Sequence, residues 1–225
     1  MSEQPVMVFR DVTKVYPLPA GDVTALDGVS FQVDRGEFIS VMGPSGSGKS
    51  TLLNLMGCLD TPTTGDIFIS GTRIGDMSDT ELTNLRRDRI GFIFQYFNLF
   101  PLLNILENVT FPMMLKSQKE VDPQKGKEVL RAVQLDEELF THTPTEISGG
   151  QQQRVAVARA LINDPDILLC DEPTGNLDSK TGAGIMDLMT ELNRKGTTII
   201  MVTHDQGIAD YSKRTIRIAD GRIVS

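Results

Sequence analysis

The 225-residue sequence lacks Trp, has only two cysteines and is poor in aromatic residues, which make up 6% of it. Two cysteines, Cys58 and Cys170, are too few for a disulfide framework, so a reducing compartment is the simplest expectation. No apolar run approaches the roughly 18 residues of a membrane-spanning helix. The first ten residues lack a basic segment followed by an apolar one, so we expect no secretory signal. We therefore expect a soluble chain that reaches a membrane only through a partner.

Basic clusters are also scarce, and the formal net charge is -8, from 30 acidic and 22 basic residues. The longest basic cluster is Arg86, Arg87 and Arg89, and Asp88 interrupts it. Proteins that bind nucleic-acid backbones carry a basic stripe or patch, so we expect no nucleic-acid partner. A polyanionic ligand would instead need a local concentration of positive potential.

The apolar patterns predict an α/β chain, in which short buried strands alternate with helices. Strands are expected at residues 6–16, 23–33, 38–42, 66–74, 90–95, 167–170 and 198–203, with a hairpin around 219–222. Helices are expected from residue 48 to about 58, from Ser78 onward, and over 179–194. Ser78 is followed three residues later by Glu81, which is the pattern of a capping box.

A helical subdomain is expected within this α/β chain at roughly residues 80–163. Residues 102–163 read mostly as helix, with predicted breaks at Pro112, Pro123 and Pro144. The length and the 40% hydrophobic fraction suit one large domain, so residues 1–225 are treated as a single domain with this insertion.

The segment GPSGSGKS at residues 43–50 matches the phosphate-binding pattern G-x-x-x-x-G-K-[ST], between a predicted strand and a predicted helix. Its glycines let backbone N–H groups point inward, and the following helix adds the positive end of its dipole. The loop residues expected to contact phosphate are Gly43, Ser45, Gly46, Ser47, Gly48, Lys49, Ser50 and Thr51. Lys49 would reach the β- and γ-phosphates, and the Ser50 hydroxyl would bind Mg²⁺.

Two adjacent acids, Asp171 and Glu172, follow the apolar run at 167–170. Ligands of parallel sheets lie at the carboxyl ends of the strands, so Asp171 is expected beside the phosphate loop, where it would hold Mg²⁺. Glu172 would orient or deprotonate the water that attacks the γ-phosphate. The plainer alternative, a solvated turn before Pro173, is disfavoured by the apolar strand and the phosphate loop.

A second anion site is predicted at Ser148, Gly149, Gly150 and Gln151, which precede a helix expected over 151–162. The alternative is an ordinary helix cap by Ser148. The segment ISGGQ at 147–151 makes the chain resemble the ABC-ATPase family, whose signature reads LSGGQ. Ile147 departs from that signature but keeps an apolar side chain.

This resemblance, which covers essentially the whole chain, implies roles for four further residues. Tyr16 stands where an aromatic ring stacks on adenine, and Gln95 where a glutamine contacts Mg²⁺ and the attacking water. Asp178 matches a loop that crosses the interface between two copies, and His204 matches a histidine that contacts the γ-phosphate. The implied fold is a P-loop NTPase of the ABC type, with a mixed sheet, an antiparallel β subdomain and the helical insertion.

The resemblance further implies an ATPase that binds ATP and Mg²⁺ and dimerises around ATP to drive a transmembrane permease. At subfamily level the chain is similar to the macrolide-export and lipoprotein-releasing (MacB/LolD) group. The expected location is cytoplasmic, on the inner face of the cell membrane through the permease. The exposed apolar loop after Gln95 is the expected docking point.

Three other interpretations stay open from the sequence. One is an ATPase subunit of a non-transport membrane complex of the cell-division type, which the sequence barely separates from export. Another is a soluble ABC ATPase of DNA repair or translation, which the lack of a second domain or a coiled-coil insert disfavours. The third is a module that binds nucleotide without hydrolysing it, which Glu172, Gln95 and His204 disfavour.

Overall fold

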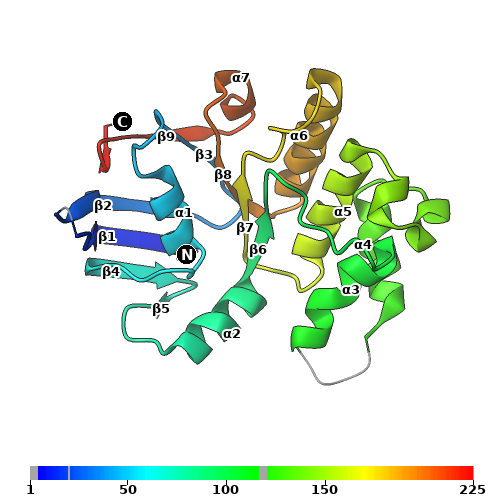
Figure 1. Cartoon of the computed structure of the whole chain (residues 1–225), viewed down its shortest axis with the longest axis horizontal. Coiled ribbons are helices and arrows are strands. Elements are labelled where there is room, and N and C mark those ends of the chain that lie inside the picture. Colours follow the sequence, from blue (N-terminus) through cyan, green and yellow to red (C-terminus); the bar gives the residue numbers. More distant parts are fainter. Residues whose placement is uncertain (1–4, 20, 117–120, 225) are drawn as a thin grey trace.

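The computed structural model describes residues 5–19, 21–116 and 121–224, which form two sheets and a set of helices (Figure 1). The strands are β1 (Met7–Tyr16), β2 (Val23–Val33), β3 (Phe38–Met42), β4 (Thr64–Ile69), β5 (Thr72–Arg73), β6 (Ile90–Ile93), β7 (Ile167–Asp171), β8 (Thr198–Val202), β9 (Arg214–Ala219) and β10 (Arg222–Ile223). The α-helices are α1 (Lys49–Met56), α2 (Asp79–Arg89), α3 (Ile105–Lys116), α4 (Pro123–Ala132), α5 (Gly149–Leu161), α6 (Ser179–Arg194) and α7 (Gln206–Ala209), with 3-10 helices at Glu137–Thr141 and Pro144–Glu146.

The larger sheet has the strand order β10-β9-β3-β8-β7-β6, and its paired strands run parallel except for the hairpin of β9 and β10. The smaller sheet is antiparallel, in the order β2-β1-β4-β5. The predicted combination of a mixed sheet, an antiparallel sheet and helices is therefore confirmed.

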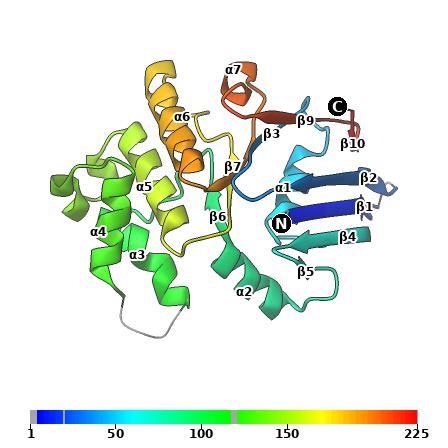
Figure 2. The same cartoon turned by 180° about the vertical axis from the view of Figure 1, so that it is seen from behind.

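Two hydrophobic clusters lie on opposite faces of the larger sheet, because successive side chains of a strand point to opposite sides. In β8, Ile200 and Val202 join the cluster that contains α1 and the antiparallel sheet. Ile199 and Met201 join the cluster that contains residues of α3, α4, α5 and α6. Figures 1 and 2 accordingly show α1 on the side of the antiparallel sheet and α5 and α6 on the other side. The central strands of the larger sheet thus lie between two packed hydrophobic layers.

Two details differ from the sequence-based expectations. The single strand expected at 66–74 is a hairpin of β4 and β5, because Ser70 and Gly71 adopt positive φ angles of 48° and 80° and turn the chain. The expected break at Pro112 is wrong, since Pro112 lies inside α3. Loss of one backbone hydrogen bond is tolerated there because Ile105 and Val109 of the same helix are fully buried.

Other expectations on the helices are confirmed or adjusted by a residue or two. Ser78 caps α2 and forms the predicted capping box with Glu81. Pro123 occupies the first turn of α4, where a missing N–H is harmless, after the cap Asp122. The helix expected to begin at Gln151 begins at Gly149. Within the described residues, no helix has the length and apolar character needed to cross a bilayer.

Candidate active site

The phosphate loop joins the buried strand β3 to the helix α1, as its motif predicted. Gly46 and Gly48 have φ angles of 78° and 105°, a region that residues with a Cβ rarely adopt. Gly48 is the N-cap of α1 and provides no side chain to bond the first N–H groups of the helix. These N–H groups and the positive end of the helix dipole are therefore left for an anion.

Lys49 lies across the loop that precedes it. Its ammonium donates to the carbonyl oxygens of Gly43 at 2.7 Å and Pro44 at 2.8 Å, so a phosphate would have to replace carbonyl partners. The Ser47 hydroxyl is buried and has no hydrogen-bond partner among the described residues. Ser50 is exposed, which leaves its hydroxyl accessible beside the first turn of α1. A polar ligand would satisfy groups that the protein itself leaves free.

Asp171 ends β7, and its half-buried carboxyl group stands in an unfavourable electrostatic setting. Burial and the neighbouring charge of Glu172 raise the pKa of Asp171, whereas the charge of Lys49 acts in the opposite direction. A bound cation would therefore stabilise the ionised form of Asp171.

Glu172 has a positive φ of 47° and is tied to the end of β8. Its backbone N–H donates to the carbonyl of Val202 at 2.9 Å. Its carboxylate accepts from the Thr203 hydroxyl at 3.1 Å and from the backbone N–H of His204 at 3.0 Å. The His204 ring nitrogen Nδ1 lies 2.5 Å from the same carboxylate.

Three predicted catalytic residues, Lys49, Glu172 and His204, and the predicted metal ligand Asp171 act on one another through charge. The hydrogen bond and the negative charge of Glu172 raise the pKa of His204, and the charge of Lys49 acts against this. Lys49 also acts on Asp171. The structure therefore brings Lys49, Asp171, Glu172 and His204 into one electrostatic cluster at the carboxyl ends of parallel strands, which is where α/β proteins bind ligands.

The donor set fits Mg²⁺ only if the substrate contributes ligands. Among the described residues there is no group of three or more His, Cys, Asp or Glu side chains that could hold a metal ion. Mg²⁺ is usually bound by one or two carboxylates together with substrate phosphates and water. The predicted ligands Asp171, Ser50 and Gln95 would form such an incomplete set.

Gln95 follows β6 and lies against the segment after Glu172. The backbone carbonyl of Gln95 accepts a hydrogen bond of 2.9 Å from the side-chain amide of Asn176. A Cβ placed on Gly175 would come within 2.8 Å of the side-chain amide nitrogen of Gln95, so the two residues pack closely. The structure thus holds Gln95 next to the loop that begins at residue 173.

The signature segment lies at the beginning of α5. Ser148 is the N-cap, and it forms a reciprocal capping box with Gln151. Gly149 lies close to Leu177, and a Cβ on Gly150 would come within 2.4 Å of the Thr181 methyl group. Ser148 therefore acts as an ordinary helix cap, and the same segment also packs closely against α6.

Asp178 caps α6 in the structure, accepting hydrogen bonds from the backbone N–H groups of Lys180 and Thr181. This places it beside the signature segment. Helix α5 packs with the cluster on one face of the larger sheet, and α1 packs with the cluster on the other face. The predicted site residues therefore fall into two groups. The Lys49 group consists of Lys49, Ser50, Gln95, Asp171, Glu172 and His204. The Ser148 group consists of Ser148, Gly149, Gly150, Gln151 and Asp178.

Tyr16 ends β1 and is held on two sides. Its hydroxyl donates to Asp60 at 2.9 Å, and the ammonium of Lys14 lies 4.9 Å from the centre of its ring. Burial, followed by the hydrogen bond to Asp60, raises the pKa of the Tyr16 phenol.

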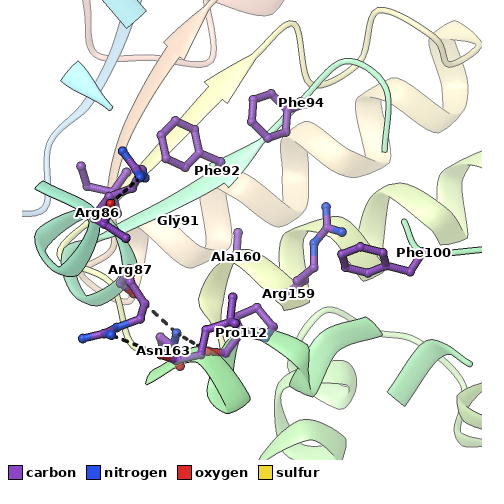
Figure 3. Close-up of a pocket in the computed structure, with 13 residues that line it drawn as sticks. Arg86, Arg87, Gly91, Phe92, Phe94, Phe100, Pro112, Arg159, Ala160 and Asn163 are labelled. Atoms are coloured by element: carbon purple, nitrogen blue, oxygen red, sulfur yellow. Dashed lines mark hydrogen bonds between the residues drawn. The ribbon is translucent and has the colours of Figure 1, made fainter. Parts of the chain in front are cut away.

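A groove of about 570 Å³ lies between α2, β6, α3 and α5 (Figure 3). Apolar side chains such as Phe92, Phe94 and Phe100 line it together with Arg86 and Arg159. None of the four residues of the electrostatic cluster around Lys49 lines this groove. The groove is therefore distinct from the electrostatic cluster around Lys49.

Sequence analysis missed three residues that organise these sites. Thr203 donates to Glu172, Asp60 binds Tyr16, and Arg159 donates to the carbonyls of Phe97 and Asn98 after Gln95. The position of Thr203 at the end of a buried strand was a usable signal. The other two contacts join residues more than 40 positions apart, and no local pattern marks them.

Comparisons with known proteins agree on one family. A family model described as ABC transporter matches residues 26–175. The ABC transporter ATP-binding protein MJ0796 of Methanocaldococcus jannaschii, itself called uncharacterized, is 48% identical over 95% of this chain and 93% of its own length. The macrolide export ATP-binding/permease protein MacB of Hyphomonas neptunium is 46% identical over 98% of this chain, but the match covers 34% of that protein.

The fold gives the same result. A dimeric structure of the ATP-binding cassette MJ0796, in a post-hydrolysis state bound to ADP and Pi, matches with a TM-score of 0.87 and 46% identity over 97% of both chains. A family model covers most of the chain, and relatives nearly half identical to it match almost all of its length. The chain belongs to the ABC transporter family and is an ATP-binding subunit that hydrolyses ATP.

Proposed function

We propose that the chain works as one of a pair, with ATP bound between the Lys49 loop of one copy and the Ser148 turn of the other. The observation that carries this proposal is the placement of α1 and α5 on opposite faces of the larger sheet. One chain thus has two helix ends suited to phosphate, packed in different layers. A second copy would bring the two kinds of end together, and the dimeric structure of the similar cassette supports this reading.

Each residue of the Lys49 group has a chemical task in this proposal. Lys49 binds the β- and γ-phosphates, and Ser50, Gln95 and Asp171 hold Mg²⁺, which would neutralise charge on the phosphates. Glu172 orients and deprotonates the attacking water, and His204 contacts the γ-phosphate. Glu172 and His204 are already hydrogen-bonded to each other, which supports a joint role.

The partner copy would supply Ser148, Gly149, Gly150, Gln151 and Asp178 to the same nucleotide, and Tyr16 of the first copy would stack on the adenine. The γ-phosphate would then satisfy donors from both copies, so ATP would stabilise the closed pair. Hydrolysis and phosphate release would remove this bridge and allow the copies to separate. We also propose that residues 1–225 act as one ATP-binding domain, with the helical part at roughly 80–163.

We further propose that the pair drives a transmembrane permease and is held by it at the cytoplasmic face of the membrane. The groove of Figure 3 and the exposed apolar side chains of Tyr96, Phe100 and Leu102 support a docking surface after Gln95. Leu102 is 93% exposed, and burial of this apolar side chain against a partner would be favourable in free energy. The likeness to MacB, whose name joins ATP-binding and permease parts, favours export. A cell-division type membrane complex is the alternative function.

A Glu172→Gln variant tests the proposed pair and the role of Glu172 together. Gln keeps the shape of Glu but removes its negative charge, so we expect ATP hydrolysis to stop while ATP still binds. Gel filtration with ATP and Mg²⁺ should then show a dimer, and a Glu172→Gln/Ser148→Arg double variant should stay monomeric. Retained hydrolysis together with an unchanged monomer peak in the single variant would refute the proposal.

A further inference from the structure

The side chains of Lys14, Tyr16 and Asp60 form a polar cluster beside the end of β1. The carboxylate of Asp60 has three donors: Oδ1 accepts from the Lys14 ammonium at 2.5 Å and from the backbone N–H of Thr61 at 2.7 Å, and Oδ2 accepts from the Tyr16 hydroxyl at 2.9 Å. Lys14 also donates to the carbonyl of Thr61 at 2.8 Å. Its side chain is 12% exposed and that of Asp60 26%, so the cluster is largely shielded from water.

The chain brings Asp60 to this place by the way it leaves the phosphate-loop helix. After α1, Gly57 caps the helix and Cys58 takes a positive φ of 53°, which turns the chain back. The following segment runs beside β1, where the backbone N–H of Thr63 donates to the carbonyl of Thr13 at 2.9 Å. Asp60 therefore lies shortly after α1, the helix that begins at Lys49.

The electrostatics of the cluster favour the charged carboxylate. Burial acts to raise the pKa of Asp60, but the hydrogen bonds from Lys14 and Tyr16 outweigh it and leave that pKa below its ordinary value. A charge-assisted hydrogen bond is roughly twice as strong as a neutral one, so the anchoring of the phenol is firm. Lys14 at the same time stands over the Tyr16 ring.

We propose that Asp60 is a positioning residue for the adenine site, because it holds the hydroxyl of Tyr16 and the ammonium of Lys14 and so fixes the plane of the Tyr16 ring. Lys14 lies over one face of the ring, so the base of a nucleotide would stack on the other face. Asp60 itself touches no part of the nucleotide in this arrangement. The inference rests on the proposed stacking role of Tyr16 and adds the group that keeps the ring ready for it.

A fixed ring has a predictable thermodynamic consequence. A ring that is held in the stacking orientation before binding loses less conformational freedom when the base arrives. Only ligands that carry a base gain from this, because the phosphate loop binds the phosphates independently. The effect of Asp60 should therefore be visible with ATP and absent with inorganic tripolyphosphate.

Isothermal titration calorimetry with ATP and with tripolyphosphate tests the inference on the full chain and its variants. An aromatic stack is worth roughly two- to tenfold in an equilibrium constant, so Tyr16→Ala should weaken ATP binding by that factor. Asp60→Ala should weaken it by about threefold, a part of the same effect. Neither change should alter the dissociation constant for tripolyphosphate. Asp66→Ala, which removes an ion pair with Arg73 on the same antiparallel sheet, is the matched control.

Two further variants separate positioning from folding. Tyr16→Phe keeps the ring and loses only the bond to Asp60, so it should reproduce the loss seen with Asp60→Ala even if that variant folds poorly. Adding Asp60→Ala to Tyr16→Ala should weaken ATP binding no further. The phenol gives an independent signal: the ultraviolet titration of Tyr16, identified by its loss in Tyr16→Phe, should move to lower pH in Asp60→Ala.

The outcomes distinguish this inference from the function on which it rests. If Tyr16→Ala leaves ATP affinity unchanged, the stacking role fails and the inference fails with it. If Tyr16→Ala weakens ATP binding but Asp60→Ala and Tyr16→Phe do not, only the role of Asp60 is overturned. An equal loss for ATP and tripolyphosphate in Asp60→Ala would likewise overturn it, since that loss would reflect general damage to the site.

Discussion

The imidazole Nδ1 of His204 and the carboxylate Oε1 of Glu172 lie 2.5 Å apart, so the residue proposed to activate water is already engaged by the residue proposed to contact the γ-phosphate. The second carboxylate oxygen, Oε2, accepts from the hydroxyl of Thr203. Both oxygens of Glu172 therefore have partners within the chain. A water molecule would have to share or displace one of them, and a γ-phosphate that draws the His204 ring toward itself would leave Oε1 with only the backbone N–H of His204 as a partner.

The first prediction concerns the protonation of His204. Its hydrogen bond to Glu172 and the negative charge of that carboxylate raise the pKa of His204 above the ordinary value of 6.5. In Glu172→Gln both causes are weakened, so the pKa should fall toward that value. The chain has only two histidines, and proton NMR titration with His142→Gln to assign the signals measures the change directly. Equal midpoints in the wild type and in Glu172→Gln would contradict the contact.

The same shift sets the sign of a pH effect on stability. Because the pKa of His204 is higher in the folded than in the unfolded chain, the interaction stabilises the fold fully below about pH 6.5, and this contribution disappears as the pH rises through the raised pKa. The His204 side chain is 76% exposed, so solvent screening keeps the effect small. Urea unfolding of the wild type and of His204→Gln should therefore differ more at pH 6 than at pH 8.

The second prediction concerns Lys49, whose ammonium bridges the carbonyls of Gly43 and Pro44. Lys49→Ala removes the positive charge that the phosphates would meet, and a hydrogen bond to a charged group contributes about 1.5–3 kcal/mol. We expect ATP binding to weaken by at least about tenfold, measured by calorimetry. Lys195→Ala, which removes an exposed ion pair with Glu191 at the end of α6, should leave the ATP dissociation constant unchanged. An unchanged constant in Lys49→Ala would contradict its role.

Much of the Lys49 group could be predicted from sequence because Asp171, Glu172 and His204 lie at or just after the end of a buried strand. Asp171 ends β7, and His204 lies two residues after β8. Parallel strands expose their carboxyl ends at one edge of a sheet, so short apolar runs followed by polar residues predict proximity without knowledge of the loops. The phosphate loop is predictable for the same reason, since its motif contains both its glycines and its lysine.

Contacts that depend on distant turns could not be predicted in this way. Asp60 meets Tyr16 only because the chain reverses at Cys58, a non-glycine residue with positive φ that no simple pattern marks. Pro112 was expected to end a helix, and burial of neighbouring side chains in α3 overrides its local preference. The position of the helices relative to the sheet is likewise decided by packing of two separate clusters, which a single sequence does not reveal.

The third prediction concerns Arg159, which connects α5 to the segment after Gln95. Its guanidinium donates to the carbonyls of Asn98 at 2.6 Å and Phe97 at 2.9 Å. Arg159→Met keeps much of the apolar stem but loses both donors, so local opening should become easier by about 1–3 kcal/mol. Hydrogen exchange of residues 96–100 should then be faster. Arg154→Met is the control on the same helix, since Arg154 donates instead to Val133, and faster exchange at 96–100 in both variants would contradict a specific link.

The last prediction compares two glycines that differ in the space around them. A Cβ on Gly91 in β6 would lie 2.4 Å from the carbonyl oxygen of Ala160 and 2.7 Å from the Leu168 side chain, so Gly91→Ala should destabilise the fold by about 1–3 kcal/mol as α5 is pushed from the sheet. A Cβ on Gly184 in α6 would meet nothing closer than the Arg154 guanidinium at 3.8 Å. Gly184→Ala should stabilise the fold by about 0.5–1 kcal/mol because alanine favours the helix. Urea unfolding measures both changes, and a Gly91→Ala variant as stable as the wild type or more stable would show that the packing of α5 on β6 is looser than these contacts require.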